Sequence, residues 1–78
     1  MREKHLRLVI SFRTTTAAMA METLCEAERI GGRIIPLPRE ISADCGLAWR
    51  AELSQREVLE ALMRRENIDA VGIYEVMA

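Results

Sequence analysis

The sequence predicts an α+β domain, a ferredoxin-like βαββαβ sandwich in which an antiparallel four-stranded sheet carries two helices on one face. Three observations lead to this prediction. The chain has 78 residues, 50% apolar and 29% charged, which suits a single small folded domain, residues 1–78. Its hydrophobic pattern divides into six segments in the order strand, helix, strand, strand, helix, strand. Right-handed crossovers then fix the strand order as 4-1-3-2, counting strands along the chain.

The first strand and the first helix occupy residues 6–30. Residues 6–12 alternate in character, as in a half-buried strand, and Leu6, Leu8, Ile10 and Phe12 share its predicted core face. The three threonines at 14–16 offer N-caps for a helix expected to run to about Ile30, where two glycines stop it. Its predicted buried stripe consists of Ala17, Ala20, Met21, Leu24 and Ala27.

The central strands are predicted at residues 33–37 and 47–52, with a loop between them. Pro36 cannot donate to a sheet ladder, so the strand that contains it should lie at an edge or end there. Alternation in the next strand puts Leu47, Trp49 and Ala51 on one face and Ala48, Arg50 and Glu52 on the other.

The second helix and the last strand complete the domain. Ser54 followed by Glu57 has the spacing of a capping box, and the helix behind it should end near Asn67. The last strand is predicted at residues 70–76. The predicted buried stripe of the helix consists of Val58, Leu59, Leu62 and Met63.

Composition excludes several classes of function. The net charge is −1 with no basic block, so a nucleic-acid partner is not expected. No apolar run approaches the ~20 residues of a membrane span, and no signal-peptide pattern opens the chain, so the expected location is the cytoplasm. Two cysteines and one histidine predict neither a metal site nor a disulfide. A core this small gains from association, so a homodimer is compatible with the sequence.

The loop at residues 38–46 is the most unusual segment. Pro36 and Pro38 make its entry stiff, and Cys45 is followed by Gly46, which leaves the neighbouring backbone uncovered. This arrangement can present a sulfur atom. The alternative is that Cys45 is a small buried hydrophobe.

A nucleophilic cysteine reacts as its thiolate, which nearby positive charge stabilises. Arg39 and Arg50 are the candidates for that charge, whereas Asp44 would oppose it. The second cysteine, Cys25, falls at the edge of the first helix's stripe and is expected to pack between helix and sheet. As a resolving thiol for Cys45 it would need a Cα separation of about 7 Å or less, which the different layers of this topology disfavour.

Residues 36–48 carry a longer signature, Pro-x-Pro-Arg-x-Ile-Ser-x-x-Cys-Gly-Leu-Ala. In this signature and over almost its whole length, the chain resembles the small Se/S carrier-like proteins, the DUF3343 family. The family's cysteine matches Cys45. The surrounding residues that match are Pro36, Pro38, Arg39, Ile41, Ser42 and Gly46.

The resemblance implies that Cys45 carries a sulfur or selenium atom as a persulfide or perselenide. A cysteine desulfurase or selenocysteine lyase would be the donor, and a selenium- or sulfur-utilising enzyme the acceptor. Arg39 or the Gly46 amide would stabilise the anion, with Ser42 and Arg50 as supporting residues. Such a domain needs no cofactor and is a co-substrate rather than an enzyme.

Two other functions remain open at this stage. One is a non-covalent binding module, in which Arg39 and the loop amides anchor a small anion or a partner protein and Cys45 is structural. The other is a thiol redox sensor, in which Cys45 is oxidised to a sulfenate or to an intermolecular disulfide.

Overall fold

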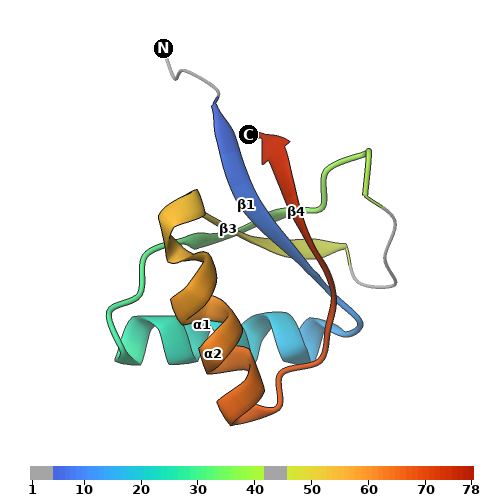
Figure 1. Cartoon of the computed structure of the whole chain (residues 1–78). Coiled ribbons are helices and arrows are strands. Elements are labelled where there is room, and N and C mark those ends of the chain that lie inside the picture. Colours follow the sequence, from blue (N-terminus) through green and yellow to red (C-terminus); the bar gives the residue numbers. More distant parts are fainter. Residues whose placement is uncertain (1–4, 42–45) are drawn as a thin grey trace.

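The predicted α+β arrangement is confirmed by the computed structural model, which describes residues 5–41 and 46–78. The four strands form one antiparallel sheet in the order β2-β3-β1-β4, which is the predicted order read from the other edge (Figure 1). The elements are β1 (Leu6–Phe12), α1 (Thr15–Ala27), β2 (Arg33–Pro36), β3 (Leu47–Ala51), a 3-10 turn (Leu53–Gln55), α2 (Arg56–Glu66) and β4 (Ala70–Met77).

One face of the sheet, called here the helix face, packs against both helices and forms the main core. Leu8, Ile10 and Phe12 of β1 are fully buried there, as their alternation predicts. Trp49 and Ala51 of β3 join them, which confirms the predicted faces of that strand. The helices contribute Ala18, Met21, Cys25, Leu59, Leu62 and Met63.

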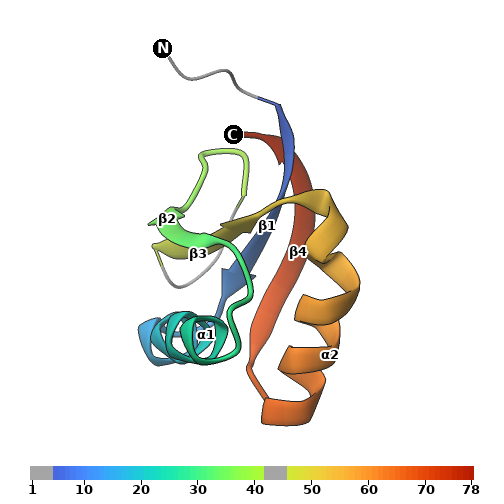
Figure 2. The same ribbon diagram turned by 90° about the vertical axis from the view of Figure 1, so that its left-hand side faces the viewer.

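The opposite face, called here the loop face, carries a second and smaller cluster. Val9, Ala48 and Ile41 are buried in it. Ile41 belongs to the chain that follows β2, and this segment lies on the opposite side of the β2–β3 pair from α1 (Figure 2). The partly buried members are Ile35, Leu37, Tyr74 and Val76.

Helix α1 begins as predicted but ends early. The Thr14 hydroxyl oxygen accepts a hydrogen bond from the Ala17 N–H at 3.1 Å. The helix ends at Ala27 rather than Ile30, because Arg29 adopts a left-handed conformation with φ 56°. The Ile30 N–H then donates to the Cys25 carbonyl at 2.8 Å, which closes the helix before the glycines are reached.

The buried stripe of α1 is also rotated from the prediction. Ala27 is exposed, whereas Ala18 and Cys25 are buried beside Met21. Ala18, Met21 and Cys25 share one face of the helix at i, i+3 and i+7. Ala17 and Leu24 of the predicted stripe lie beside this face and are partly buried against the core.

Two details of α2 differ from the sequence prediction. Ser54 lies inside the 3-10 turn and Gln55 is the N-cap without a side-chain hydrogen bond, so the predicted capping box is wrong. Val58 was expected on the buried stripe, but 43% of its surface is exposed. The C-terminal prediction is confirmed, since Asn67 ends the helix with φ 55°.

The strand ends shift by one residue. β2 stops at Pro36 and β3 at Ala51, one residue short of prediction, and β4 extends to Met77. The prediction that Pro36 belongs to an edge strand is confirmed, since β2 is the outermost strand on its side.

Candidate functional site

The loop that follows β2 is fastened to the sheet at its base. The Leu37 N–H donates to the Gly46 carbonyl at 2.9 Å, one step beyond the last β2–β3 pair, Pro36 with Leu47. The two ends of the loop therefore leave the sheet next to each other.

A tight turn folds the first part of the loop back over the loop face. The Ile41 N–H donates to the Pro38 carbonyl at 3.0 Å, which closes a β-turn with Arg39 and Glu40 at its centre. Ile41 is only 6% exposed and packs in the cluster with Val9. This anchor is not among the predicted roles of the loop, although an apolar residue that follows Arg39 and Glu40 is a signal for it.

Cys45 and Ser42, two of the predicted site residues, lie outside the described residues. Their neighbours on either side are described. Ile41 is fixed by burial on the sheet, and Gly46 is fixed by its hydrogen bond to Leu37. The stretch 42–45 therefore departs from and returns to two positions that the fold determines.

The described surroundings do not require glycine at position 46, since a Cβ added there would meet no atom of residues 5–41 or 46–78 within 4 Å, its chain neighbours aside. Gly32 differs, since its φ is +141° and a Cβ would lie 2.4 Å from the indole nitrogen of Trp49. The fold thus accounts for glycine at position 32 but not at position 46.

One arginine lies on the turn after β2, and two others lie across from each other on β2 and β3. Arg39 is exposed on the turn and makes no hydrogen bond or ion pair with residues 5–41 or 46–78. Arg50 lies half-buried on the loop face, directly opposite Arg33 of β2 in the sheet register. The register therefore places two positively charged side chains across from each other on β2 and β3. Arg33 was not predicted as a site residue, because only the register reveals its position.

Ser11 is a buried polar residue on the same face. It is fully buried, and its hydroxyl oxygen has no hydrogen-bond partner among the described residues. Its backbone partners are Ala48 on β3 and Gly72 on β4, so it lies at the end of β1 where β3 begins after the loop. A hydroxyl in this situation costs free energy that a hydrogen-bond partner would recover.

Cys25 occupies a very different environment. It is 1% exposed in the main core, on the helix face. Burial, with a smaller contribution from the charge of Glu28, raises the pKa of its thiol to about 11. Cys25 is therefore a protonated thiol at neutral pH, and the prediction that it serves packing is confirmed.

A search for other kinds of site gives two further results. The part of the chain that the structure describes holds no group of three or more potential metal ligands. Within the same residues, neither helix is sufficiently long and apolar to cross a membrane.

Comparison with known proteins identifies a family. Searches of curated proteins and of solved structures give no significant match. A family described as "Putative Se/S carrier protein-like" matches residues 7–75, which include every strand and helix in whole or in large part. That span covers most of the chain, and the chain therefore belongs to this Se/S carrier protein-like family.

Proposed function

We propose that this domain carries a single sulfur or selenium atom on the Cys45 thiolate and delivers it from a donor enzyme to an acceptor. The family match supports a carrier in general. The observation that carries the proposal in this chain is the double fastening of the loop, at Ile41 and at Gly46, on either side of the stretch that contains Cys45. A carrier needs a thiol at a defined and accessible place rather than a deep active site.

The transfer step is a thiol exchange. The Cys45 thiolate attacks the outer sulfur of a persulfide on the donor, R–S–SH, and forms the S–S bond of Cys45–S–SH. The S–S bond of the donor breaks at the same time, and the donor leaves as the thiolate R–S⁻. The sulfane sulfur moves without net oxidation, and a perselenide reacts in the same way. Delivery to the acceptor repeats the exchange with Cys45 as the leaving thiolate.

The surroundings of the loop favour anionic sulfur. Arg39 is exposed on the turn and carries a fixed positive charge, and Arg33 and Arg50 add two further guanidinium groups at the other end of the β2–β3 pair. Gly46 adds a backbone amide next to Cys45 in the sequence, at a residue that has no side chain of its own. Such charges and amides lower the pKa of a thiol and stabilise the anion of a bound persulfide.

Intact-mass analysis tests the proposal. The purified protein is incubated with a cysteine desulfurase and cysteine, or with a selenocysteine lyase and selenocysteine, and its mass is then measured without reductant. We expect an increment of one sulfur or one selenium atom, removed by dithiothreitol. The Cys45→Ser variant should show no increment, whereas Cys25→Ala should load as the wild type does.

The same measurement separates the alternative functions. An increment of one or two oxygen atoms on Cys45 after mild peroxide, without any chalcogen increment, would replace the carrier with a redox sensor. Absence of every cysteine-linked adduct, together with partner binding that Cys45→Ser leaves unchanged, would leave a non-covalent module in which Cys45 is structural.

A further inference from the structure

The two outer strands of the sheet differ in how well their free edges are protected. β2 has four residues and contains Arg33 and Pro36, and both a charge and a proline hinder the addition of another strand. β4 has eight residues and is the longest strand. It contains no proline, lysine or arginine, and its one charged residue, Glu75, is already paired with Arg56 at 3.6 Å.

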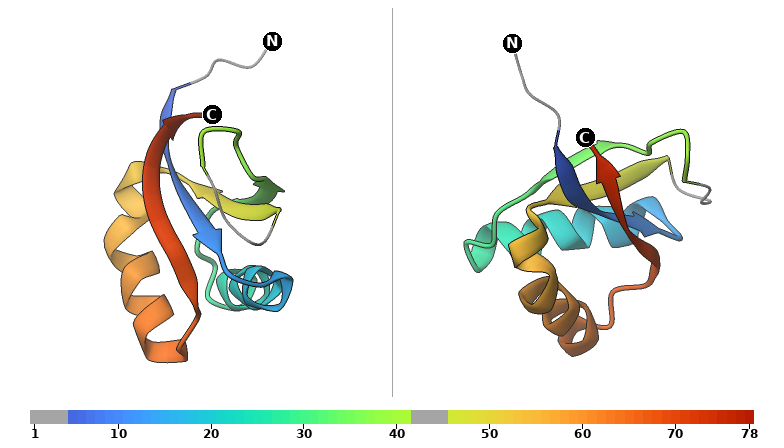
Figure 3. Two further views of the ribbon diagram at one scale, coloured as in Figure 1. Left: turned by 90° about the vertical axis from the view of Figure 1, so that its right-hand side faces the viewer. Right: turned by 45° about the horizontal axis from the view of Figure 1, so that its top comes forward.

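The edge of β4 is open along its length. Within the described chain β4 pairs only with β1, and no other element lies in front of it in the left view of Figure 3. Val71 and Met77 on this strand are 40% and 59% exposed. The one irregularity in its ladder, next to Val71, lies near its start and leaves the pairing from Gly72 to Met77 continuous. Unprotected edges of this kind recruit a further strand.

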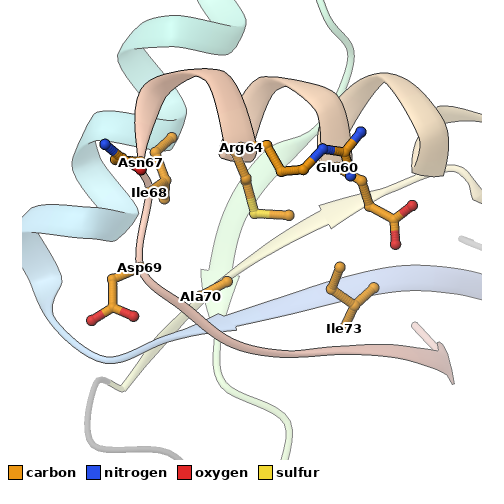
Figure 4. A pocket seen from close by; sticks show the side chains of 8 residues that line it. Glu60, Arg64, Asn67, Ile68, Asp69, Ala70 and Ile73 are labelled. Carbon is orange, nitrogen blue, oxygen red and sulfur yellow. The ribbon is translucent and has the colours of Figure 1, made fainter.

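A groove runs between β4 and α2 along this edge. Its volume is about 750 Å³, and apolar side chains such as Ile73 form its floor (Figure 4). Glu60 and Arg64 project from α2 beside it, one helical turn apart. Glu60 is paired with Arg56 at 3.4 Å, whereas Arg64 forms no hydrogen bond or ion pair within residues 5–41 and 46–78. The helix therefore offers a negative and a positive charge in sequence on the side of the open edge.

We propose that a second copy of this chain pairs with β4 in an antiparallel manner, which makes one continuous eight-stranded sheet with Glu60 of each copy against Arg64 of the other. A two-fold axis at the middle of β4 makes the same strand its own partner. If the same axis is level with the midpoint between Glu60 and Arg64 on α2, Glu60 of each copy faces Arg64 of the other copy.

The two requirements on the axis agree in position. The Arg56–Glu75 ion pair shows which residues of α2 and β4 lie at the same height along the two elements. The midpoint of Glu60 and Arg64 lies six residues further along α2, about 9 Å at the rise of an α-helix. The same distance back along β4 is about three residues, which reaches Gly72 and Ile73. The midpoint of β4 lies between residues 73 and 74, within about one residue of that position.

The spacing of the helices also fits. α2 packs over the β1–β4 half of the sheet, with Leu59 and Leu62 in the cluster that includes Ile10 and the flanking Ala70 and Ile73. In the paired sheet the two copies of α2 are separated by two strand spacings, about 10 Å. This is the distance at which helices pack through their side chains. The dimer would then bury Val71 and close the groove.

Charge reversal tests the proposal through sedimentation velocity at several protein concentrations. We expect wild type to sediment as a dimer. Glu60→Arg places arginine opposite arginine, and Arg64→Glu places glutamate opposite glutamate, so each variant alone should weaken the dimer by ~10-fold or more. An equimolar mixture of the two variants should recover the dimer, because each unlike pair is restored in the heterodimer. Arg33→Glu, on the β2 edge, is the matched control and should sediment as wild type.

The mixture separates loss of the interface from loss of the fold, because variants that fail to fold would not recover on mixing. Three results would overturn the proposal. They are a monomeric wild type at every concentration, a dimer that survives both single reversals, and a dimer that Arg33→Glu disrupts.

Discussion

The two faces of the sheet differ greatly in how many residues they bury. Among the described residues, the helix face buries eleven in one continuous cluster, which come from β1, β3, α1 and α2. The apolar cluster on the loop face buries three, and one of these, Ile41, comes from a turn rather than from a strand or helix. The loop face also holds Ser11, a buried hydroxyl without a partner among the described residues.

This difference separates stability from function in a chain of 78 residues. The helix face supplies most of the buried apolar area, which provides the main driving force for folding. On the loop face, Ile41 from the turn after β2 packs on the sheet, and the Leu37–Gly46 hydrogen bond holds the base of the loop. Changes at these described positions should alter the proposed chemistry more than the stability.

The same substitution on each face gives the most direct test of this comparison. Ile10→Ala on the helix face removes a fully buried side chain and should cost about 4 kcal/mol of unfolding free energy. A domain of this size has only about 3–5 kcal/mol available from its core, so the variant should be largely unfolded. Urea denaturation followed by circular dichroism measures the effect. Ile10→Val should cost about 1 kcal/mol and stay folded, so its transition gives the dependence of the unfolding free energy on urea concentration. A fully folded Ile10→Ala variant would contradict the assignment of stability to this face.

Ile41→Ala is the matched change on the loop face. Because Ile41 packs in the smaller cluster, we expect a cost of about 2 kcal/mol, at the low end for such truncations. The variant should remain folded in the same denaturation experiment. Chalcogen loading of Cys45 should nevertheless slow several-fold, since one fastening of the loop is lost. Loading at the wild-type rate would show that the position of Ile41 does not control the thiol.

Because Cys25 is buried on the helix face, the unfolding free energy of the domain should depend on pH in the alkaline range. The unfolded thiol ionises near its ordinary pKa of 9.0, whereas the folded thiol ionises at about 11. The unfolded state therefore releases its proton first, and the unfolding free energy should fall by about 2 kcal/mol as the pH rises from 9 to 11. Below pH 9 the contribution is constant. Urea denaturation across this range should show the decline in wild type and a smaller one in Cys25→Ala, and identical slopes would refute it.

Ser11→Ala should act in the opposite direction to the other core substitutions. It removes a buried hydroxyl that has no partner among the described residues and adds no cavity larger than one oxygen atom. We expect the unfolding free energy to rise by about 1 kcal/mol. Loss of stability in the thermal or urea transition would show instead that this hydroxyl has a hydrogen-bond partner.

The sequence predicted the sheet more accurately than the helix ends. Leu8, Ile10 and Phe12 alternate along β1 because one face of the strand is buried, so the residue types themselves indicate the strand and its buried face. The early end of α1 depends on Arg29 in a left-handed conformation, which arginine rarely adopts and which no composition signal announces. Ser54 has the spacing of a capping box with Glu57, yet the backbone there forms a 3-10 turn, so the spacing alone does not determine the start of the helix.

The candidate site was predictable only in part. The cysteine signature identifies the loop, and the structure shows how its described ends are fastened. The anchor at Ile41 and the alignment of Arg33 with Arg50 depend on which residues meet across the sheet. Such alignments follow from the register of β2 against β3, and single-sequence periodicity does not fix a register.

The smallest change in stability, and the sharpest test of the loop face, is expected for Gly46→Ala. A methyl group at this position meets no atom of the described residues outside its chain neighbours, so the unfolding free energy should change by less than about 0.5 kcal/mol. The same is true of Gly31→Ala, which makes it the matched control. The added methyl adjoins the Gly46 amide, which we propose stabilises a chalcogen on Cys45, and it should hinder that contact. Loading measured by intact mass should therefore slow several-fold in Gly46→Ala and stay unchanged in Gly31→Ala. Equal loading in both variants would mean that glycine at position 46 serves neither the fold nor the carrier chemistry, and the Gly46 amide would lose its proposed role.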